Sequence, residues 1–294
     1  MIDQTPHLFC FGLGYSASAL AQDLLKEGWR VSGTHRPAES TPDLKNIQTF
    51  AFDRTTPLAN FEAIFKTVTH VLISVPPDGA GCPVLDVHGA DIAAHASHLK
   101  SLGYLSTVGV YGNTDGKPVV ETSRLLPTQE RSRFRGLAET RWQNLAVRTQ
   151  LSLFVFRLAG IYGPGRSPFA KVRAGTAQRI AKPQHLFSRI HVDDIANVIK
   201  AAFAKPKAHG IYNVCDDAPA APSDVIKYAC KLLKKPVPKE ISFADAQRNM
   251  SSMALSFWAD NRLIKNDKIK NKLNVELIYP DYKVGLKAVL KAEA

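Results

Sequence analysis

Three features of the sequence predict an α/β protein with a doubly wound parallel sheet, the Rossmann fold, followed by a small C-terminal substrate-binding lobe. Strand-like and helix-like segments alternate along most of the first 160 residues. The strand-like segments are continuously apolar, as in HVLISV and LSLFVF, and such strands are typical of a parallel sheet covered by helices on both faces. A glycine turn follows the first strand-like segment, His7 to Phe11, and leads into an amphipathic helix.

The glycine turn, GLGYSA, carries the strongest functional signal. Gly12 permits a tight bend, and Gly14 lets backbone N–H groups approach a pyrophosphate at the N-terminus of the following helix. Ala17 occupies the third position of this G-x-G-x-x-A pattern, where a small residue suffices. We therefore expect a dinucleotide here; the alternative is a turn that only joins a strand to a helix. The residues expected to contact the dinucleotide are Gly12, Gly14, Tyr15, Ser16 and Ala17.

The end of the second strand-like segment, residues 29–34, indicates which dinucleotide. A carboxylate about 20 residues past the glycines would accept the ribose 2′-OH of NAD, whereas an arginine there suits the 2′-phosphate of NADP. The chain has Thr34, His35 and Arg36 at this place, so we expect NADP(H) in preference to NAD(H). In the alternative interpretation, Arg36 is a solvated loop residue. Further cofactor contacts are expected after the next two strands, at Asp53, Ser74 and Val75.

The remaining pattern predicts the organisation of the chain. Residues 1–160 are expected to form the NAD(P)-binding domain and residues 161–294 mostly the substrate lobe, with 190–215 returning to the sheet. Helices are expected from about Val192, after a capping Ser223, and from about Tyr282. Asp193 or Asp194 is expected to cap the first of these. The other predicted strands are 48–52, 70–75, 104–108, 151–158 and 211–215.

Composition limits the classes of function. The 294 residues are 45% hydrophobic and 22% charged, as in ordinary globular proteins, and no apolar run approaches the length of a membrane span. With no signal-peptide pattern at the N-terminus, we expect a cytoplasmic protein without a membrane partner. The four cysteines are scattered and the histidines lack supporting carboxylates, so we expect no disulfide and no metal site.

The formal charge of +12 raises the question of an anionic partner. Arginines gather on a predicted helix around Arg131 to Arg141, and lysines on a predicted C-terminal helix with Arg262. The lysine cluster has no interleaved aromatic residues and no nucleic-acid motif, so we interpret it as a solvated helix face. Binding of nucleic acid is the weakest functional hypothesis, and a small-molecule substrate is expected instead.

Several segments together resemble the extended short-chain dehydrogenase/reductase family, which includes sugar-nucleotide epimerases and dehydratases. The resemblance runs nearly from end to end and depends on the order and spacing of its parts. They are the glycine turn with Tyr15 and Ser16, Asp53, LSTVGVYG at 105–112, FRLAGIYGPGR at 156–166, RIHVDDIANVI at 189–199 and YNVCDD at 212–217. The resemblance implies an NAD(P)-dependent oxidoreductase or epimerase acting on a small, anionic or sugar-type substrate.

The catalytic positions of that family are only partly retained. The family uses a tyrosine as acid and base, a lysine one helical turn later, and a serine or threonine that orients the substrate. Thr107 matches the last of these, but the alignment puts Arg131 at the tyrosine and Arg135 at the lysine. Arginine stays protonated in proteins and cannot act as a general acid or base near neutral pH.

The two arginines nevertheless suit roles in binding. Spaced four apart on a helix, they share a face. Arg135 is expected to hold the cofactor ribose, and Arg131 to clamp a carboxylate or phosphate of the substrate, or to polarise a carbonyl. The proton would then come from water or from Tyr111. The alternative is an exposed i,i+4 ion pair between Arg135 and Glu139, without contact to any ligand.

A second hypothesis for the whole protein belongs to another class. A retained cofactor site beside a lost tyrosine–lysine pair is also what a non-catalytic NADP(H) sensor or regulatory module would have. Either protein is expected to be a monomer or a homodimer.

Overall fold

The computed structural model describes residues 5–38 and 45–293. Its centre is a seven-stranded sheet in the order β11-β7-β5-β4-β1-β2-β3, and all neighbouring strands in it are parallel. The predicted doubly wound parallel sheet is thereby confirmed. The strands are β1 (His7–Phe11), β2 (Arg30–His35), β3 (Gln48–Ala51), β4 (His70–Ile73), β5 (Ser101–Thr107), β7 (Leu153–Leu158) and β11 (Gly210–Val214).

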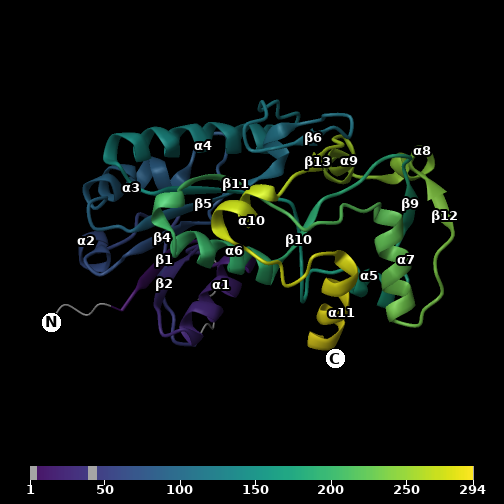
Figure 1. Ribbon diagram of the computed structural model, residues 1–294, viewed down its shortest axis with the longest axis horizontal. Coiled ribbons are helices and arrows are strands. Elements are labelled where there is room, and N and C mark those ends of the chain that lie inside the picture. The colour runs from purple at the N-terminus through teal and green to yellow at the C-terminus, as the bar shows by residue number, and fades with distance from the viewer. Residues whose placement is uncertain (1–4, 39–44, 294) are drawn as a thin grey trace.

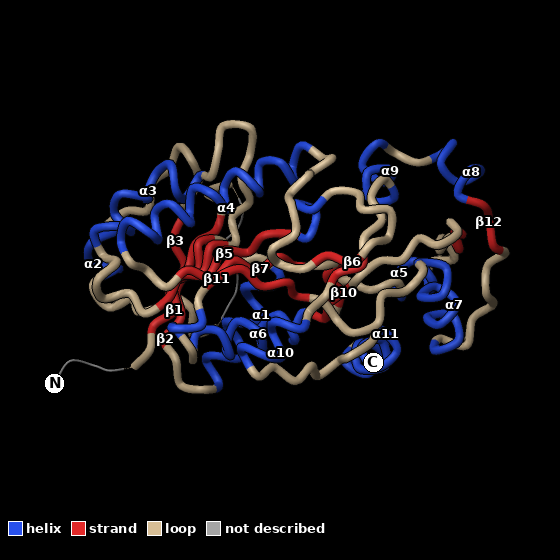
Figure 2. The backbone as a smooth tube through the Cα atoms, turned by 45° about the horizontal axis from the view of Figure 1, so that its top comes forward, coloured by secondary structure: helices blue, strands red, loops and turns tan. Residues whose placement is uncertain are grey.

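Helices cover both faces of this sheet, as Figures 1 and 2 show. On one face lie α2 (Phe61–Phe65), α3 (Pro83–Ala94) and α4 (Glu130–Thr149); on the other lie α1 (Tyr15–Lys26), α6 (Val192–Phe203) and α10 (Asp267–Leu273). In the described part of the chain, no helix combines the length and the apolar character needed to cross a bilayer.

Strand β1 illustrates why the apolar run folds as a central strand. Successive side chains point to opposite faces, so Leu8 and Cys10 join the core under α1 and α6, and Phe9 and Phe11 join the core under α2 to α4. All four side chains are fully buried. An apolar residue is therefore required at each of these four positions, and this strand matches its predicted bounds.

The strand order reverses between β1 and β4. The chain adds β2 and β3 on one side of β1, and then adds β5, β7 and β11 on the far side of β4. In parallel α/β sheets such a point opens a crevice beyond the carboxyl ends of the strands. The glycine turn follows β1 at this point, and Ser74 and Val75 follow β4. The fold thus brings the two segments together.

The second lobe lies at the end of the molecule where α5, α7, α8, β9 and β12 are grouped in Figure 1. It is built around the core of Phe169, Val225, Leu286 and their neighbours. The strands outside the main sheet form parallel pairs: β8 (Gly160–Tyr162) with β10 (Arg189–His191), β9 (Arg179–Ala181) with β12 (Glu240–Ser242), and β6 (Pro118–Val119) with β13 (Leu263–Ile264). The helices are α5 (Phe169–Arg173), α7 (Pro222–Leu232), α8 (Phe243–Ala246), α9 (Ser252–Trp258) and α11 (Tyr282–Ala292).

Two predicted helix caps are wrong. Ser223 lies inside α7, which begins at Pro222 without a side-chain cap. At α6 the imidazole of His191 accepts the Asp193 N–H, whereas Asp194 turns to accept the N–H groups of Ile278 and Tyr279. In the lysine-rich segment, α10 begins at Asp267, so Arg262 precedes it. The predicted domain boundary at residue 160 remains a prediction.

Candidate functional site

The glycine turn is held by the neighbouring strand. Gly12 has φ +89°, its N–H donates to the Thr34 hydroxyl at 2.8 Å, and the Leu13 N–H donates to the Thr34 carbonyl at 2.9 Å. A Cβ on Gly12 would lie 3.1 Å from the Val75 side chain, in a conformation that residues with side chains rarely adopt. Thr34, predicted as a cofactor contact, therefore also fixes the shape of the turn.

The turn ends at an N-terminus that is open to a ligand. Gly14 is the N-cap of α1 and provides no side-chain cap, and the first helical bond runs from the Ser18 N–H to the Gly14 carbonyl. The atom nearest to a Cβ built on Gly14 would be the Ser74 hydroxyl at 4.0 Å. These features fit a pyrophosphate, which needs uncapped N–H groups and a close approach to the backbone. Ala17 lies beneath the turn and is fully buried in the core.

A cavity of about 660 Å³ extends from the turn along the ends of β2, β3 and β4. The Asp53 carboxylate in it accepts the N–H groups of Thr55 and Thr56 at 2.8 Å, so it shapes its own loop. The next residue, Arg54, forms ion pairs with Asp78 and Asp86. The predicted cofactor residues that line this cavity are Gly12, Gly14, Thr34, His35, Arg36, Asp53, Ser74 and Val75.

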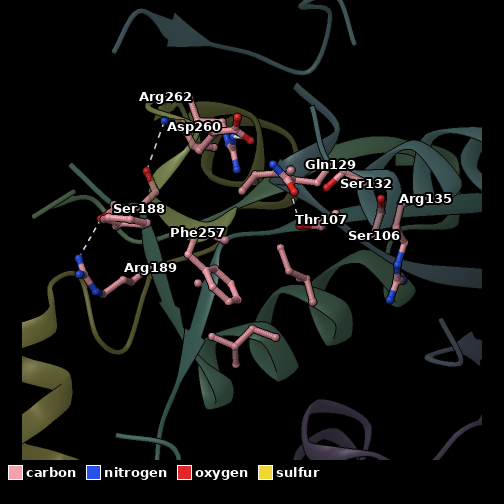
Figure 3. A pocket seen from close by; sticks show the side chains of 18 of the residues that line it. Ser106, Thr107, Gln129, Ser132, Arg135, Ser188, Arg189, Phe257, Asp260 and Arg262 are labelled. Carbon is pink, nitrogen blue, oxygen red and sulfur yellow. Dashed lines mark hydrogen bonds and ion pairs between the residues drawn. The ribbon is translucent and has the colours of Figure 1, made fainter. Parts of the chain in front are cut away.

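A second, larger cavity of about 820 Å³ lies on the other side of the turn, between the sheet and the second lobe. Ser74 lines both cavities, so they meet beside the glycine turn. Figure 3 shows its inner surface, with Arg135 and Ser106 at one side, Arg189 at the opposite side and Phe257 between them. The structure brings six predicted site residues together here: Tyr15, Ser16, Ser74, Thr107, Arg131 and Arg135.

Thr107 lies where β5 ends and presents its hydroxyl to the larger cavity. Its oxygen accepts the Gly109 N–H at 3.1 Å and so begins the short helix η1 (Val108–Tyr111). Within the described residues no acceptor takes its O–H, which leaves that proton for a ligand. The role of Thr107 in orienting a substrate remains a prediction.

Arg131 and Arg135 lie in the first two turns of α4 and line the same cavity. The Arg131 guanidinium donates to the Ser256 hydroxyl at 3.0 Å and lies 4.7 Å from the ring centre of Phe257. Arg135 donates to the Leu105 carbonyl at the end of β5. Each guanidinium thus has a partner in the wall of the cavity, although Arg131 is exposed and Arg135 is half-buried. Whether either arginine contacts a ligand remains a prediction.

The predicted pair between Arg135 and Glu139 is wrong. Glu139 turns inward, is fully buried and binds Arg157 of β7 through both carboxylate oxygens, the shortest contact being 2.7 Å. It also accepts the Ser106 hydroxyl at 2.5 Å. Glu139 therefore lies on the face of α4 that packs against β5 and β7, and its partners are inside the protein.

Tyr111 was the one predicted catalytic residue that the structure places away from both cavities. Its hydroxyl donates to Asn213 at 2.6 Å and accepts from Arg157 at 2.8 Å, and only 1% of its surface is exposed. Burial raises the pKa of Tyr111. Both hydrogen-bonding directions of the hydroxyl are used inside the protein, so it does not face a ligand in this cavity.

The larger cavity is strongly cationic. Among the described residues that line it, the ionisable side chains are five arginines, two tyrosines and one aspartate. Both oxygens of Asp260 are engaged, by Thr128 at 2.7 Å and by Arg262 at 2.8 Å. Burial raises the pKa of Tyr15 and of Tyr162, so neither phenol is poised to release a proton near neutral pH. The cavity is therefore suited to binding anions.

The sequence did not single out three of these arginines as site residues. Arg166, Arg189 and Arg262 lie in separate segments that the fold brings together. Arg166 lies over the Tyr15 ring, and the Tyr15 hydroxyl donates to the Pro164 carbonyl at 2.9 Å. The segments of Arg166 and Arg189 carried the resemblance to a family, and this signal could have marked them for attention.

The chain is similar to known proteins in sequence and in structure. No family model matches the chain. The chain is 26% identical over 282 residues to Protein YeeZ of Escherichia coli (strain K12), an alignment that covers 92% of this chain and 95% of that protein. It is 44% identical to a functionally unknown conserved protein from Silicibacter pomeroyi DSS. The two structures match with a TM-score of 0.88 over 98% of this chain and 99% of that one.

A more distant solved structure has a similar fold. The dTDP-glucose 4,6-dehydratase from Bacillus anthracis str. Ames, in complex with NAD, has a TM-score of 0.75 at 18% identity. The match covers 98% of this chain and 96% of the dehydratase. At this level of identity the likeness establishes a common Rossmann-type architecture.

Proposed function

The chain belongs to the same family as the conserved Silicibacter pomeroyi protein, and we propose that it is an NADP(H)-binding oxidoreductase or epimerase-like enzyme that acts on a small anionic substrate. The observation that carries the proposal is the meeting of two cavities at Ser74, one beside the uncapped glycine turn and the other lined by arginines. A dinucleotide lying across the turn would have its adenosine end in the smaller cavity and its nicotinamide end in the larger one. When bound, it would supply hydride transfer.

The preference for NADP(H) is supported by the end of β2. Thr34, His35 and Arg36 line the smaller cavity, so the guanidinium is on the side where an adenosine ribose would lie. The carboxylate of the cavity nearest in sequence, Asp53, is already bound to the backbone of its own loop. A positive group and an engaged carboxylate favour a 2′-phosphate over a 2′-hydroxyl.

The substrate side is supported by Thr107, Arg131 and Arg135. Thr107 offers a hydroxyl proton, and Arg135 is fixed against the end of β5, where it would hold the ribose. Arg131 would bind a carboxylate or phosphate of the substrate, exchanging the Ser256 hydroxyl for an anionic partner. A charge-assisted bond of this kind is stronger than the neutral one it replaces.

Thermal unfolding of the full chain with NADP(H) and NAD(H) side by side tests the proposal. At a hundredfold excess over Kd, a ligand of the folded state adds about 2.7 kcal/mol of stability. We expect a clear upward shift with NADP(H), a smaller one with NAD(H), and a reduced difference in Arg36→Ala. The control is Arg248→Ala, whose side chain is 77% exposed in the second lobe. Equal absence of a shift with both dinucleotides would contradict the cofactor assignment.

A second function is favoured by the chemistry of the larger cavity. Its described ionisable residues include no histidine, lysine or glutamate, and its aspartate is fully engaged. A protein that senses NADP(H) without turnover needs no acid or base. Cofactor binding together with no turnover over a broad panel of anionic carbonyl and hydroxy compounds would favour this sensor over the enzyme.

A further inference from the structure

Arg189 differs from the other arginines of the larger cavity in its partners. It lies at the start of β10, and one guanidinium nitrogen donates to the carbonyls of Phe187 and Ala220, both at 2.9 Å. Within the described chain it has no carboxylate at ion-pair distance, whereas Arg262 is paired with Asp260 at 2.8 Å. A guanidinium removed from water without a counter-ion is costly unless another anion compensates it.

The surroundings of Arg189 strengthen this observation. Burial lowers the pKa of Arg189, so its positive charge is poorly solvated. The carboxyl group of Asp216 lies beyond ion-pair distance, and burial raises its pKa to about 7. The guanidinium also lies 6.0 Å from the ring centre of Phe187. One side of Arg189 is therefore occupied by backbone carbonyls and an aromatic ring, and it lines the cavity as well.

The position of Arg189 sets it apart from the proposed reacting end. Figure 3 shows Arg189 and Arg135 at opposite sides of the cavity, with Phe257 between them. Thr107 and Arg135 mark the end at which we place the nicotinamide. A group bound by Arg189 would thus belong to the far end of the substrate, and not to the atoms that exchange a hydride.

We propose that Arg189 binds an anionic group at the remote end of the substrate, so that the substrate is a dianion with separated charges, of the small dicarboxylate class. This rests on the proposed function, which gives the other anionic group to Arg131. Arg131 is held by Ser256 and Phe257, whereas Arg189 is held by the carbonyls of Phe187 and Ala220, so the two guanidinium groups share no partner, which favours separated charges over adjacent ones. Arginine suits both places, because its planar fork binds a carboxylate through two N–H groups.

The experiment measures the binding of simple probes to the full chain by calorimetry, with and without saturating NADPH. The probes are dicarboxylates from succinate to adipate, monocarboxylates of matched length, and inorganic pyrophosphate. We expect the best dicarboxylate to bind at least about tenfold more tightly than its matched monocarboxylate, because its second carboxylate gains a charge-assisted hydrogen bond. In Arg189→Met this advantage is expected to disappear, and in Arg189→Lys to be partly retained.

Two controls separate binding from structure. Arg248→Met removes an exposed arginine of the same lobe and should leave all probe affinities unchanged. Arg189→Met should keep its NADP(H) affinity, which shows that the variant is folded. If the variant fails to fold, the graded loss in Arg189→Lys and the preference of the wild-type chain still decide the question.

The outcomes distinguish this inference from the proposed function. If the wild-type chain does not bind NADP(H), the proposed function is overturned. An Arg189-dependent preference for dicarboxylates in that same protein would still support the remote subsite. Equal binding of mono- and dicarboxylates, no binding of any probe, or a dicarboxylate preference that survives in Arg189→Met would overturn the subsite. Tighter, Arg189-dependent binding of pyrophosphate would also overturn it, by assigning both charges to one place.

Discussion

At the scale of single residues, the buried pair of Glu139 and Arg157 is the most constrained feature next to the larger cavity. Their surfaces are 0% and 2% exposed, and Glu139 also accepts the hydroxyl of Ser106, which lines that cavity. The pair thus connects α4, β5 and β7 directly behind the proposed substrate site. Breaking one partner of such a pair leaves the other charge buried and uncompensated.

Replacement of Glu139 by Gln tests this constraint. We expect Glu139→Gln to lower the free energy of unfolding by about 3–5 kcal/mol, because Arg157 keeps its charge and loses its carboxylate. Urea unfolding near pH 7 measures the change. The matched control on the same helix is Glu130→Gln, which removes an exposed pair with Arg133 and should have little effect. A Glu139→Gln protein as stable as wild type would show that the pair contributes little.

The same residues show how far the site could be predicted. Spacing along the sequence correctly placed Arg131 and Arg135 on one helix, and the family pattern brought Thr107 to their cavity. Spacing could not decide whether Glu139 faces solvent or β7, because the partner that decides it, Arg157, is 18 residues away in a strand. For the same reason the hydrogen bond from Tyr111 to Asn213, across 102 residues, had no local signal.

At the scale of secondary-structure elements, the pairing of β1 with β2 depends on Gly33, which belongs to no sequence motif. Gly33 lies opposite Cys10 in the parallel register. A Cβ there would approach the Cys10 carbonyl oxygen to 2.6 Å and the Leu13 side chain to 2.9 Å. Since backbone cannot yield as a flexible side chain does, any side chain at this position would push β2 and the glycine turn apart.

Two glycine-to-alanine substitutions are expected to have opposite effects. Gly33→Ala should destabilise the protein by about 1–3 kcal/mol through overpacking, and should weaken dinucleotide binding as the turn shifts. Gly136→Ala lies within α4, where an added Cβ would meet no atom within 4 Å, and should stabilise by about 0.5–1 kcal/mol. Urea unfolding and the dinucleotide titration check both. A destabilised Gly136→Ala, or an unaffected Gly33→Ala, would contradict the packing argument.

Elements were predicted well where they are buried on both faces. The strand at 7–11 and the helix beginning at Val192 match their predicted limits, because continuous apolar runs and clear helical periodicity fix them. The prediction that α7 begins after Ser223 is wrong. Both a capping serine and a proline at the first helical position indicate the start of a helix, and here the helix begins at Pro222 without a cap. The small pairs β9–β12 and β6–β13 have too few residues to give a pattern.

At the scale of the whole molecule, buried titratable groups make stability depend on pH in two opposing ways. Burial lowers the pKa of His7 and of His70 to about 4. Between their ordinary value of 6.5 and about 4, the unfolded chain takes up protons that the folded chain does not, so stability is lost as the pH falls. Asp216, whose pKa burial raises to about 7, acts in the opposite direction, because its folded form holds a proton that the unfolded chain has released.

Variants separate the two contributions. His70→Phe should make stability depend less on pH between about 5 and 6.5, and Asp216→Asn should make it fall more steeply on acidification. Each change amounts to at most about 1.4 kcal/mol per pH unit. At about pH 8, Asp216→Asn should also be more stable than wild type, since it removes a buried carboxylate charge. Urea unfolding at several pH values gives these slopes, and parallel slopes for all three proteins would refute the assignment.

The contacts of Tyr15 bear on the order in which the proposed enzyme would bind its nucleotide and its substrate. Tyr15 opens α1 at the glycine turn, and its hydroxyl holds the Pro164 carbonyl, while Arg166 lies over its ring. A nucleotide bound at the glycine turn would therefore lie beside Tyr15, whose contacts hold the Pro164–Arg166 segment at the larger cavity, where we place the substrate. For the proposed enzyme we therefore expect the nucleotide to bind first and leave last, and steady-state kinetics should then show product inhibition that is competitive only between the two nucleotide forms.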